Sequence, residues 1–170
     1  MASLMENLID VLGRESTEYE ALLQLSQRKT PIIAGGDLAE LQKITDEEQE
    51  LVSRIHNLDR QRAGVTADIA DVLNRDVKEL KLPNLITMLS ARPAEQQALA
   101  EAHDRLQAAV RGLKRVNEQN SELLNSALEM VEFEMNLLQA AKTAHKRRRM
   151  QEIPWALSIM ASMLSSKIQR

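Results

Sequence analysis

The side chains with the most versatile chemistry in this chain are three histidines, His56, His103 and His145. Histidine can ligate a metal or carry a phosphoryl group, and di-iron helical bundles use Glu-x-x-His pairs on facing helices. That spacing is absent here, because Ser53 stands three residues before His56 and Glu101 stands two before His103. The sequence therefore predicts no metal site. Phosphotransfer at His56, an outward-facing position on a helix, is the one enzymatic alternative that the histidines leave open.

Other catalytic arrangements are missing from the sequence. It has no glycine-rich phosphate loop, no G-x-S-x-G motif and no pair of carboxylates placed to be desolvated. It also has no cysteine, which excludes a thiol nucleophile and disulfides and fits a reducing cytoplasm. We therefore predict a protein that is not an enzyme, uses no cofactor and is cytoplasmic.

A basic run, Lys146 to Arg149, is the strongest local concentration of charge. It could contact phosphate groups or an acidic lipid surface, or it could be the solvated end of a helix that favours the helix dipole. The net charge of −3 and the lack of a second basic face argue against nucleic acid. No run of apolar residues is long enough to span a membrane, and the N-terminus does not resemble a secretory signal.

The elements that must carry these residues are helices. From Leu99 to Ala144, apolar residues recur at alternating intervals of three and four, and only Asn120 and Glu134 interrupt the series. This rhythm is typical of a helix that buries one seam against another helix. Because no proline lies inside the series, one helix of about 75 Å is expected, starting at Pro93.

Breakers and caps delimit the other elements. Ser3 begins a first helix, which we expect to fray near Lys29 because Pro31 disfavours helical geometry in the residue before it. After the Gly35–Gly36 break, Asp37 caps a second helix with its own 3-4 seam from Leu41 to Val72. A charged loop at 74–81 leads to a short helix that begins at Pro83 and ends near Ala91.

These elements predict an all-α fold, an elongated antiparallel bundle or coiled-coil hairpin of about three long helices, one short helix and a C-terminal helical tail. The second and fourth helices pair, with the first alongside. We expect one helical-bundle domain over 1–145, followed by the basic run and an amphipathic helix over 146–170. The long helix also has a second apolar column, which widens its stripe and leaves surface for a partner: Val110, Leu124, Val131 and Leu138.

Polar residues within the seams have two interpretations. Asn120 could hydrogen-bond a bound partner, or it could be a buried polar residue that sets helix register. Glu48, Arg62 and Glu134 are most simply charged side chains that reach past the edge of the core and pair with each other.

The C-terminal segment from Ile153 to Ile168 has apolar residues on one helical face, with Pro154 in its first turn. It could fold back on the bundle, contact a partner, or lie on a membrane surface beside the basic run. The residues that would make a partner contact here are Trp155, Leu157, Met160 and Leu164.

Two stretches, in this order and spacing, resemble a known family. Gly36-Asp37-Leu38 leads through Leu41, Thr45, Glu48 and Leu51 to Arg62, and the segment Asn117–Leu124 is followed by Leu128 and Val131. Together they resemble the FlgN-type flagellar export chaperones. The resemblance covers about Leu4 to Ala144, and the sequence after Ala144 departs from the family pattern.

The resemblance implies a cytoplasmic chaperone of the flagellar type III secretion system. Such proteins bind C-terminal helical segments of the hook-filament junction proteins FlgK and FlgL, prevent premature polymerisation and deliver them to the export gate or ATPase complex. The family's cargo-binding surface lies in the C-terminal amphipathic helix. Carried onto this chain, that surface is Asn120, Leu123, Leu124, Met130, Val131 and Leu138.

The alternative is a structural coiled-coil scaffold that forms a homo-oligomer through the same stripe. A scaffold would need the second apolar column for self-association, whereas a chaperone would need it for cargo.

Overall fold

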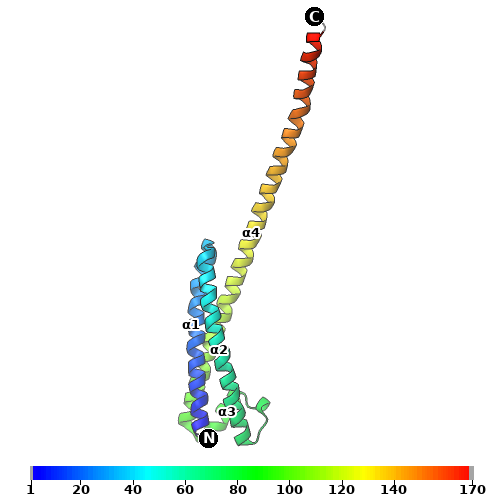
Figure 1. Cartoon of the computed structure of the whole chain (residues 1–170). Helices are drawn as coiled ribbons and strands as arrows, with labels where there is room; N and C mark the ends of the chain where they lie inside the picture. The colour runs from blue at the N-terminus through cyan, green and yellow to red at the C-terminus, as the bar shows by residue number, and fades with distance from the viewer. Residues whose placement is uncertain (1, 169–170) are drawn as a thin grey trace. The chain divides into compact units, whose positions relative to one another are not determined.

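The computed structural model describes the backbone of residues 2–168 and the side chains of residues 4–147. Within that backbone range the chain forms helices joined by short turns, which confirms the all-α prediction (Figure 1). The elements are α1 (Ala2–Gly35), α2 (Leu38–Leu73), the short 3-10 helix η1 (Val77–Glu79), α3 (Leu82–Met88), η2 (Leu89–Ala91) and α4 (Pro93–Ile168).

The chain divides into two units, residues 1–124 and 125–170. In the first unit, α1 and α2 run side by side in opposite directions and the first part of α4 packs against them (Figure 1). The α1–α2 turn consists of Gly36, whose φ is +68°, and Asp37. The Asp37 carboxylate accepts a hydrogen bond from the Glu40 backbone N–H at 3.0 Å, as the sequence predicts for an N-cap.

The core of the first unit consists of two apolar clusters, and α1 contributes to both. One cluster joins the start of α1 to the end of α2, the short helices and Leu99; the other joins the middle of α1 to α2 and Leu113. Gly112 allows α4 to approach α1 closely, because a Cβ at that position would lie 3.0 Å from Leu23 Cδ2. Helix α1 is therefore central to the bundle rather than an addition to an α2–α4 pair.

The expected fraying of the first helix before Pro31 is wrong. Helix α1 continues through Pro31 to Gly35, although proline removes one backbone hydrogen bond from the helix. Contacts on both sides of Pro31 explain this. The Thr30 hydroxyl donates to Asn120 Oδ1 at 2.7 Å, and Ile33 is buried. Tertiary packing therefore overrides the local preference.

The predicted seam of α2 is correct except at its end. Ile44, Leu51, Ile55 and Ile69 are buried, whereas Val72 is 57% exposed and Ala70 is buried instead. A straight helix has 3.6 residues per turn, so a strict 3-4 series drifts around it by about 20° per heptad. After several heptads the last predicted position has rotated out of the core.

The second unit is the continuation of α4. Its backbone is helical to Ile168, without a break at Pro154, where the sequence suggests that a separate helix starts. Every described side chain from Asn125 to Arg147 is exposed. The side chains of Trp155, Leu157, Met160 and Leu164 lie outside the described residues.

Candidate partner-binding surface

The 3-4 series of α4 is buried in its first part and exposed in its second. Leu99, Ala109, Leu113 and Val116 are all less than 9% exposed. Leu137, in the same series, is 60% exposed. The sequence predicts one continuous seam, but this chain buries only the part before Leu124.

The length of α1 explains how far the covered part extends. Thr30 contacts Asn120, and α1 ends at Gly35, about 7.5 Å further along at 1.5 Å per residue. That length covers little more than one further turn of α4 within the first unit. Leu123 and Leu124, which the sequence assigns to cargo binding, accordingly lie half-buried at the end of this unit.

Seven large apolar side chains are exposed within about three turns of the second unit. Their exposed fractions lie between 52% and 67%. Soluble proteins seldom leave so many large apolar groups together in water unless they bind something there. We call this set the α4 apolar surface: Leu128, Met130, Val131, Phe133, Met135, Leu137 and Leu138.

The sequence predicts part of this surface. Met130, Val131 and Leu138 were predicted as binding residues, and all three are exposed. Leu128, Phe133, Met135 and Leu137 were missed. Leu128 and Met135 were detectable, because they complete a second 3-4 series with Val131 and Leu138.

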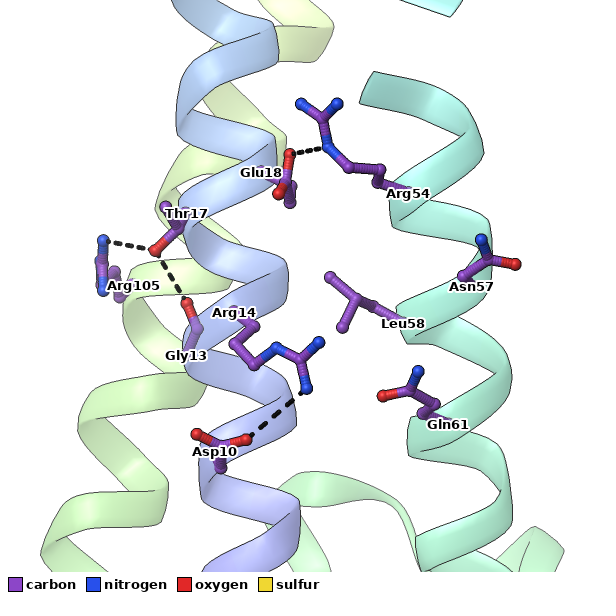
Figure 2. Close-up of a pocket in the computed structure, with 10 residues that line it drawn as sticks. All are labelled: Asp10, Gly13, Arg14, Thr17, Glu18, Arg54, Asn57, Leu58, Gln61 and Arg105. Carbon is purple, nitrogen blue, oxygen red and sulfur yellow. Dashed lines mark hydrogen bonds and ion pairs between the residues drawn. The ribbon is translucent and has the colours of Figure 1, made fainter. Parts of the chain in front are cut away.

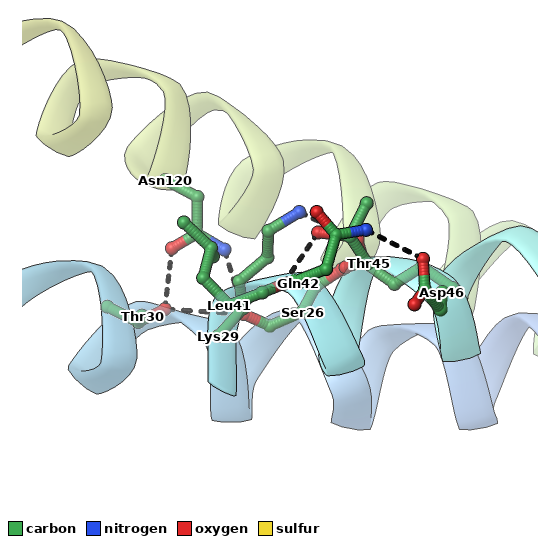
Figure 3. Close-up of polar contacts among 9 residues, drawn as sticks. Ser26, Lys29, Thr30, Leu41, Gln42, Thr45, Asp46 and Asn120 are labelled. Carbon is green, nitrogen blue, oxygen red and sulfur yellow. Dashed lines mark hydrogen bonds and ion pairs between the residues drawn. The ribbon is translucent and has the colours of Figure 1, made fainter. Parts of the chain in front are cut away.

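Asn120 is placed inside the bundle rather than on a surface. Its side chain is 4% exposed, and its amide nitrogen Nδ2 donates to the backbone carbonyl of Ser26 at 2.8 Å. Its Oδ1 accepts from the Thr30 hydroxyl, as Figure 3 shows. Of the two interpretations of Asn120, these contacts favour the buried residue that sets helix register.

The predicted pairing among Glu48, Arg62 and Glu134 is wrong. Glu48 Oε2 accepts from Lys29 Nζ at 2.7 Å, and Arg62 forms ion pairs with Glu15 and Asp59. Glu134 is exposed in the second unit. Seam position shows that a charge lies near the core edge, but the neighbouring helix decides which partner it meets.

The pair Glu15–Arg62 contains the most buried charged side chain described in the first unit, that of Glu15. Glu15 Oε2 lies 3.2 Å from Arg62 Nε, and the Glu15 side chain is 2% exposed. Burial raises the pKa of the Glu15 carboxyl, Arg62 acts in the opposite direction, and Asp59 adds to the rise. Burial also raises the pKa of nearby Tyr19.

A charged hollow of about 630 Å³ lies on the first unit (Figure 2). Arg54 Nε donates to Glu18 Oε2 at 3.0 Å, and Arg14 lies 3.8 Å from Asp10. Arg105, at its edge, binds the carboxylate of Glu20 through two hydrogen bonds, which lower the pKa of Glu20. Each arginine in the hollow thus already has a carboxylate partner, so the arrangement does not favour an anionic ligand.

The structure does not bring the histidines together. His56 is on α2, whereas His103 contacts Asp104 on α4 and His145 belongs to the second unit. Among the described side chains, no three His, Cys, Asp or Glu residues are placed to hold a metal ion. Across the same residues, no helix is long and apolar enough to cross a membrane. Lys146 and Arg147 of the basic run are exposed, and Arg148 and Arg149 lie outside the described side chains.

Residues 1–149 match the model of the FlgN family, described as FlgN protein, which is most of the chain. The chain belongs to the FlgN family. This confirms the resemblance and extends it beyond Ala144 through the basic run. FlgN proteins are chaperones of flagellum assembly, so the exposed surface of α4 occurs in a chain whose family works by binding other proteins.

One curated protein is similar to this chain over most of the length of both. The chain is 26% identical to the "Uncharacterized protein YvyG" of Bacillus subtilis (strain 168) over 133 residues, which cover 77% of this chain and 78% of the relative. No solved structure matches the chain significantly.

Proposed function

We propose that this FlgN family member is a cytoplasmic export chaperone for the hook-filament junction proteins FlgK and FlgL. It binds their C-terminal helical segments, prevents premature polymerisation and delivers them to the flagellar export gate or ATPase complex. The observation that carries this proposal is the α4 apolar surface, seven large side chains exposed on one short stretch of helix. Family membership supplies the class of partner.

The physical argument concerns the free energy of exposed apolar area. Covering one large apolar side chain contributes about 1.5–3 kcal/mol. An amphipathic cargo helix would otherwise bury its apolar face against other copies of the cargo. When it binds the α4 apolar surface instead, one contact removes both apolar faces from water. Met130 and Met135 suit such a task, because methionine side chains adapt to partners of different shape.

The division of the chain separates folding from binding. The two core clusters lie within residues 1–124, and the α4 apolar surface lies wholly within residues 125–170. Substitutions on the exposed surface should therefore leave the free energy of unfolding within about 0.5 kcal/mol of the parent protein. Loss of cargo binding without loss of fold is the behaviour expected of a chaperone surface.

The test is size-exclusion chromatography with light scattering on the full chain, alone and mixed with the C-terminal helical segment of a junction protein from the same organism. We expect a co-eluting complex of defined stoichiometry. The double variant Val131→Lys/Leu138→Lys should abolish it. The matched control is Asn136→Lys/Thr143→Lys, which adds the same charge at two exposed positions on the polar face of the same helix.

Two results would overturn the proposal. One is the absence of any complex with either junction protein. The other is a fixed homo-oligomer that Val131→Lys/Leu138→Lys dissociates, since that outcome identifies a scaffold. For the C-terminal residues, we propose that Trp155, Leu157, Met160 and Leu164 add to the cargo contact, so Leu157→Lys/Leu164→Lys in the full chain should weaken cargo binding.

A further inference from the structure

We propose that the α4 apolar surface selects a partner helix with lysine or arginine beside its apolar stripe, and that it disfavours a second copy of this chain. The inference rests on the proposed function and specifies the chemistry of the cargo helix. Its basis is the arrangement of glutamates around one row of the surface, which we call the acidic-flanked seam: Leu128, Val131, Met135 and Leu138.

The spacing of this seam is that of a coiled coil. Leu128 and Met135 take heptad position a, and Val131 and Leu138 take position d. Glu132 and Glu134 then fall at positions e and g, one on each side of the seam, and both are exposed. Residues at e and g meet the flanks of a partner helix and determine which partner and orientation are accepted.

The charge of this part of α4 has one sign. Every charged residue between Val116 and Ala141 is a glutamate, and the next cation is Lys142. Within residues 4–147, no lysine or arginine forms an ion pair with Glu132 or Glu134. Their carboxylates are thus available to a partner, and lysine or arginine at its flanking positions would complement them.

The seam ends where the charge changes sign. The next a and d positions after Leu138 are Lys142 and His145, so the apolar row stops there. A partner helix that fits the stretch of about three turns from Leu128 to Leu138 therefore has apolar residues along its own seam and basic residues on both sides of that seam. Beyond that stretch it meets the exposed Lys142 and Lys146, which favour acidic residues in the partner.

A second copy fits this pattern poorly. To cover Leu128–Leu138 with the same residues of another chain, the two segments must overlap along their length. Glu132 and Glu134 of both copies would then lie along the same interface, and like charges across a helix pair are destabilising. The two copies could instead slide along each other until the glutamates of one copy meet the lysines of the other. Leu128 or Val131 of one copy would then lie opposite His145 or Lys142 of the other, and the apolar contact would be lost.

The test uses the full-length protein and two synthetic helical peptides of equal length with leucine at every a and d position. One peptide has lysine at all e and g positions, and the other has glutamate. Binding is measured by fluorescence anisotropy at low ionic strength. We expect the lysine peptide to bind about tenfold more tightly than the glutamate peptide, since each exposed ion pair changes a dissociation constant by up to about fivefold.

Charge-reversal variants make the test specific to the seam. Glu132→Lys/Glu134→Lys should invert the preference, so that the glutamate peptide binds more tightly. Glu129→Lys is the control, because position b faces away from the seam in the same exposed stretch. Glu129→Lys changes the charge by the same amount as the single seam variant Glu132→Lys. We expect Glu129→Lys to change the ratio of the lysine-peptide affinity to the glutamate-peptide affinity by less than about twofold.

In the peptide experiment, the inference is overturned by equal binding of the two peptides, by no binding of either, or by a change with Glu129→Lys as large as that with Glu132→Lys. A homodimer that Leu128→Lys dissociates would also overturn it, by identifying a second copy as the occupant. The proposed function is judged separately. Capture of a junction-protein segment that is insensitive to Glu132→Lys/Glu134→Lys overturns this inference alone, whereas lysine-peptide binding without junction-protein capture overturns the chaperone proposal alone.

Discussion

The amide nitrogen of Asn120 in α4 donates a hydrogen bond of 2.8 Å to the backbone carbonyl of Ser26 in α1. This contact lies close to the last covered turn of α4, where the Thr30 hydroxyl also reaches Asn120. A buried amide with such partners accepts one alignment of two helices and disfavours a shift by a turn, because a shift leaves polar groups unsatisfied. It therefore fixes which residues of α4 are covered by α1 within residues 1–124.

Asn120→Ala is expected to lower the free energy of unfolding by about 1–3 kcal/mol, because it removes two hydrogen bonds between α4 and α1, from the Thr30 hydroxyl to Asn120 Oδ1 and from Asn120 Nδ2 to the Ser26 carbonyl. Urea denaturation followed by circular dichroism measures this. Asn117→Ala is the control, since Asn117 is exposed one turn earlier. If Asn120→Ala instead abolished cargo binding at unchanged stability, Asn120 would be a cargo contact.

Glu15→Gln tests the buried ion pair through its pH dependence. The pKa of Glu15 is raised in the folded protein, mainly by burial, so the folded state holds this proton more tightly than the unfolded state does. The ionised carboxylate therefore opposes folding above that raised pKa. The wild-type protein therefore gains stability as the pH falls through the raised pKa of Glu15 toward the ordinary glutamate pKa of 4.5.

We accordingly expect Glu15→Gln to be at least as stable as the wild type at neutral pH. The difference should shrink as the pH falls, because the protonated wild type and the glutamine variant are both neutral at this site. Thermal melts at several pH values measure it, with Glu6→Gln, at an exposed position of α1, as the control. A difference that grows as the pH falls would contradict the assignment of burial as the main influence.

Pro31→Ala should stabilise the protein. Proline within α1 lacks the N–H that would bond to the carbonyl of Gln27, and alanine restores it without new contacts, since Pro31 is exposed. The expected gain in the free energy of unfolding is up to about 3 kcal/mol. Differential scanning calorimetry measures it. A lower melting temperature would mean that a proline-induced bend is required for the packing of Ile33.

Asp37→Ala tests the cap at the α1–α2 turn. The loss of the hydrogen bond to the Glu40 N–H should lower the free energy of unfolding by about 1 kcal/mol. Asp37→Asn retains a side-chain acceptor and should change stability much less. If both substitutions had the same effect, the carboxylate would act through its charge at the helix N-terminus rather than through the hydrogen bond.

The local elements of this protein follow from its sequence. Asp37 begins α2, Pro93 begins α4, and the 3-4 series in both helices predict a bundle, because caps, breakers and periodicity act over a few residues. Family membership was also predictable, since it depends on the order of residues along the chain. The exception is Pro31, where contacts from Asn120 and the burial of Ile33 outweigh a local preference.

Only the tertiary structure decided which part of the α4 series is core and which part is surface. Val116 and Leu137 occupy equivalent places in one series, yet the first is 8% exposed and the second 60%. Periodicity describes one face of one helix, whereas burial depends on how far the neighbouring helices extend. The sequence does not show which residues pair with Glu48 and Asn120 for the same reason, because their partners Lys29, Thr30 and Ser26 belong to another helix, α1.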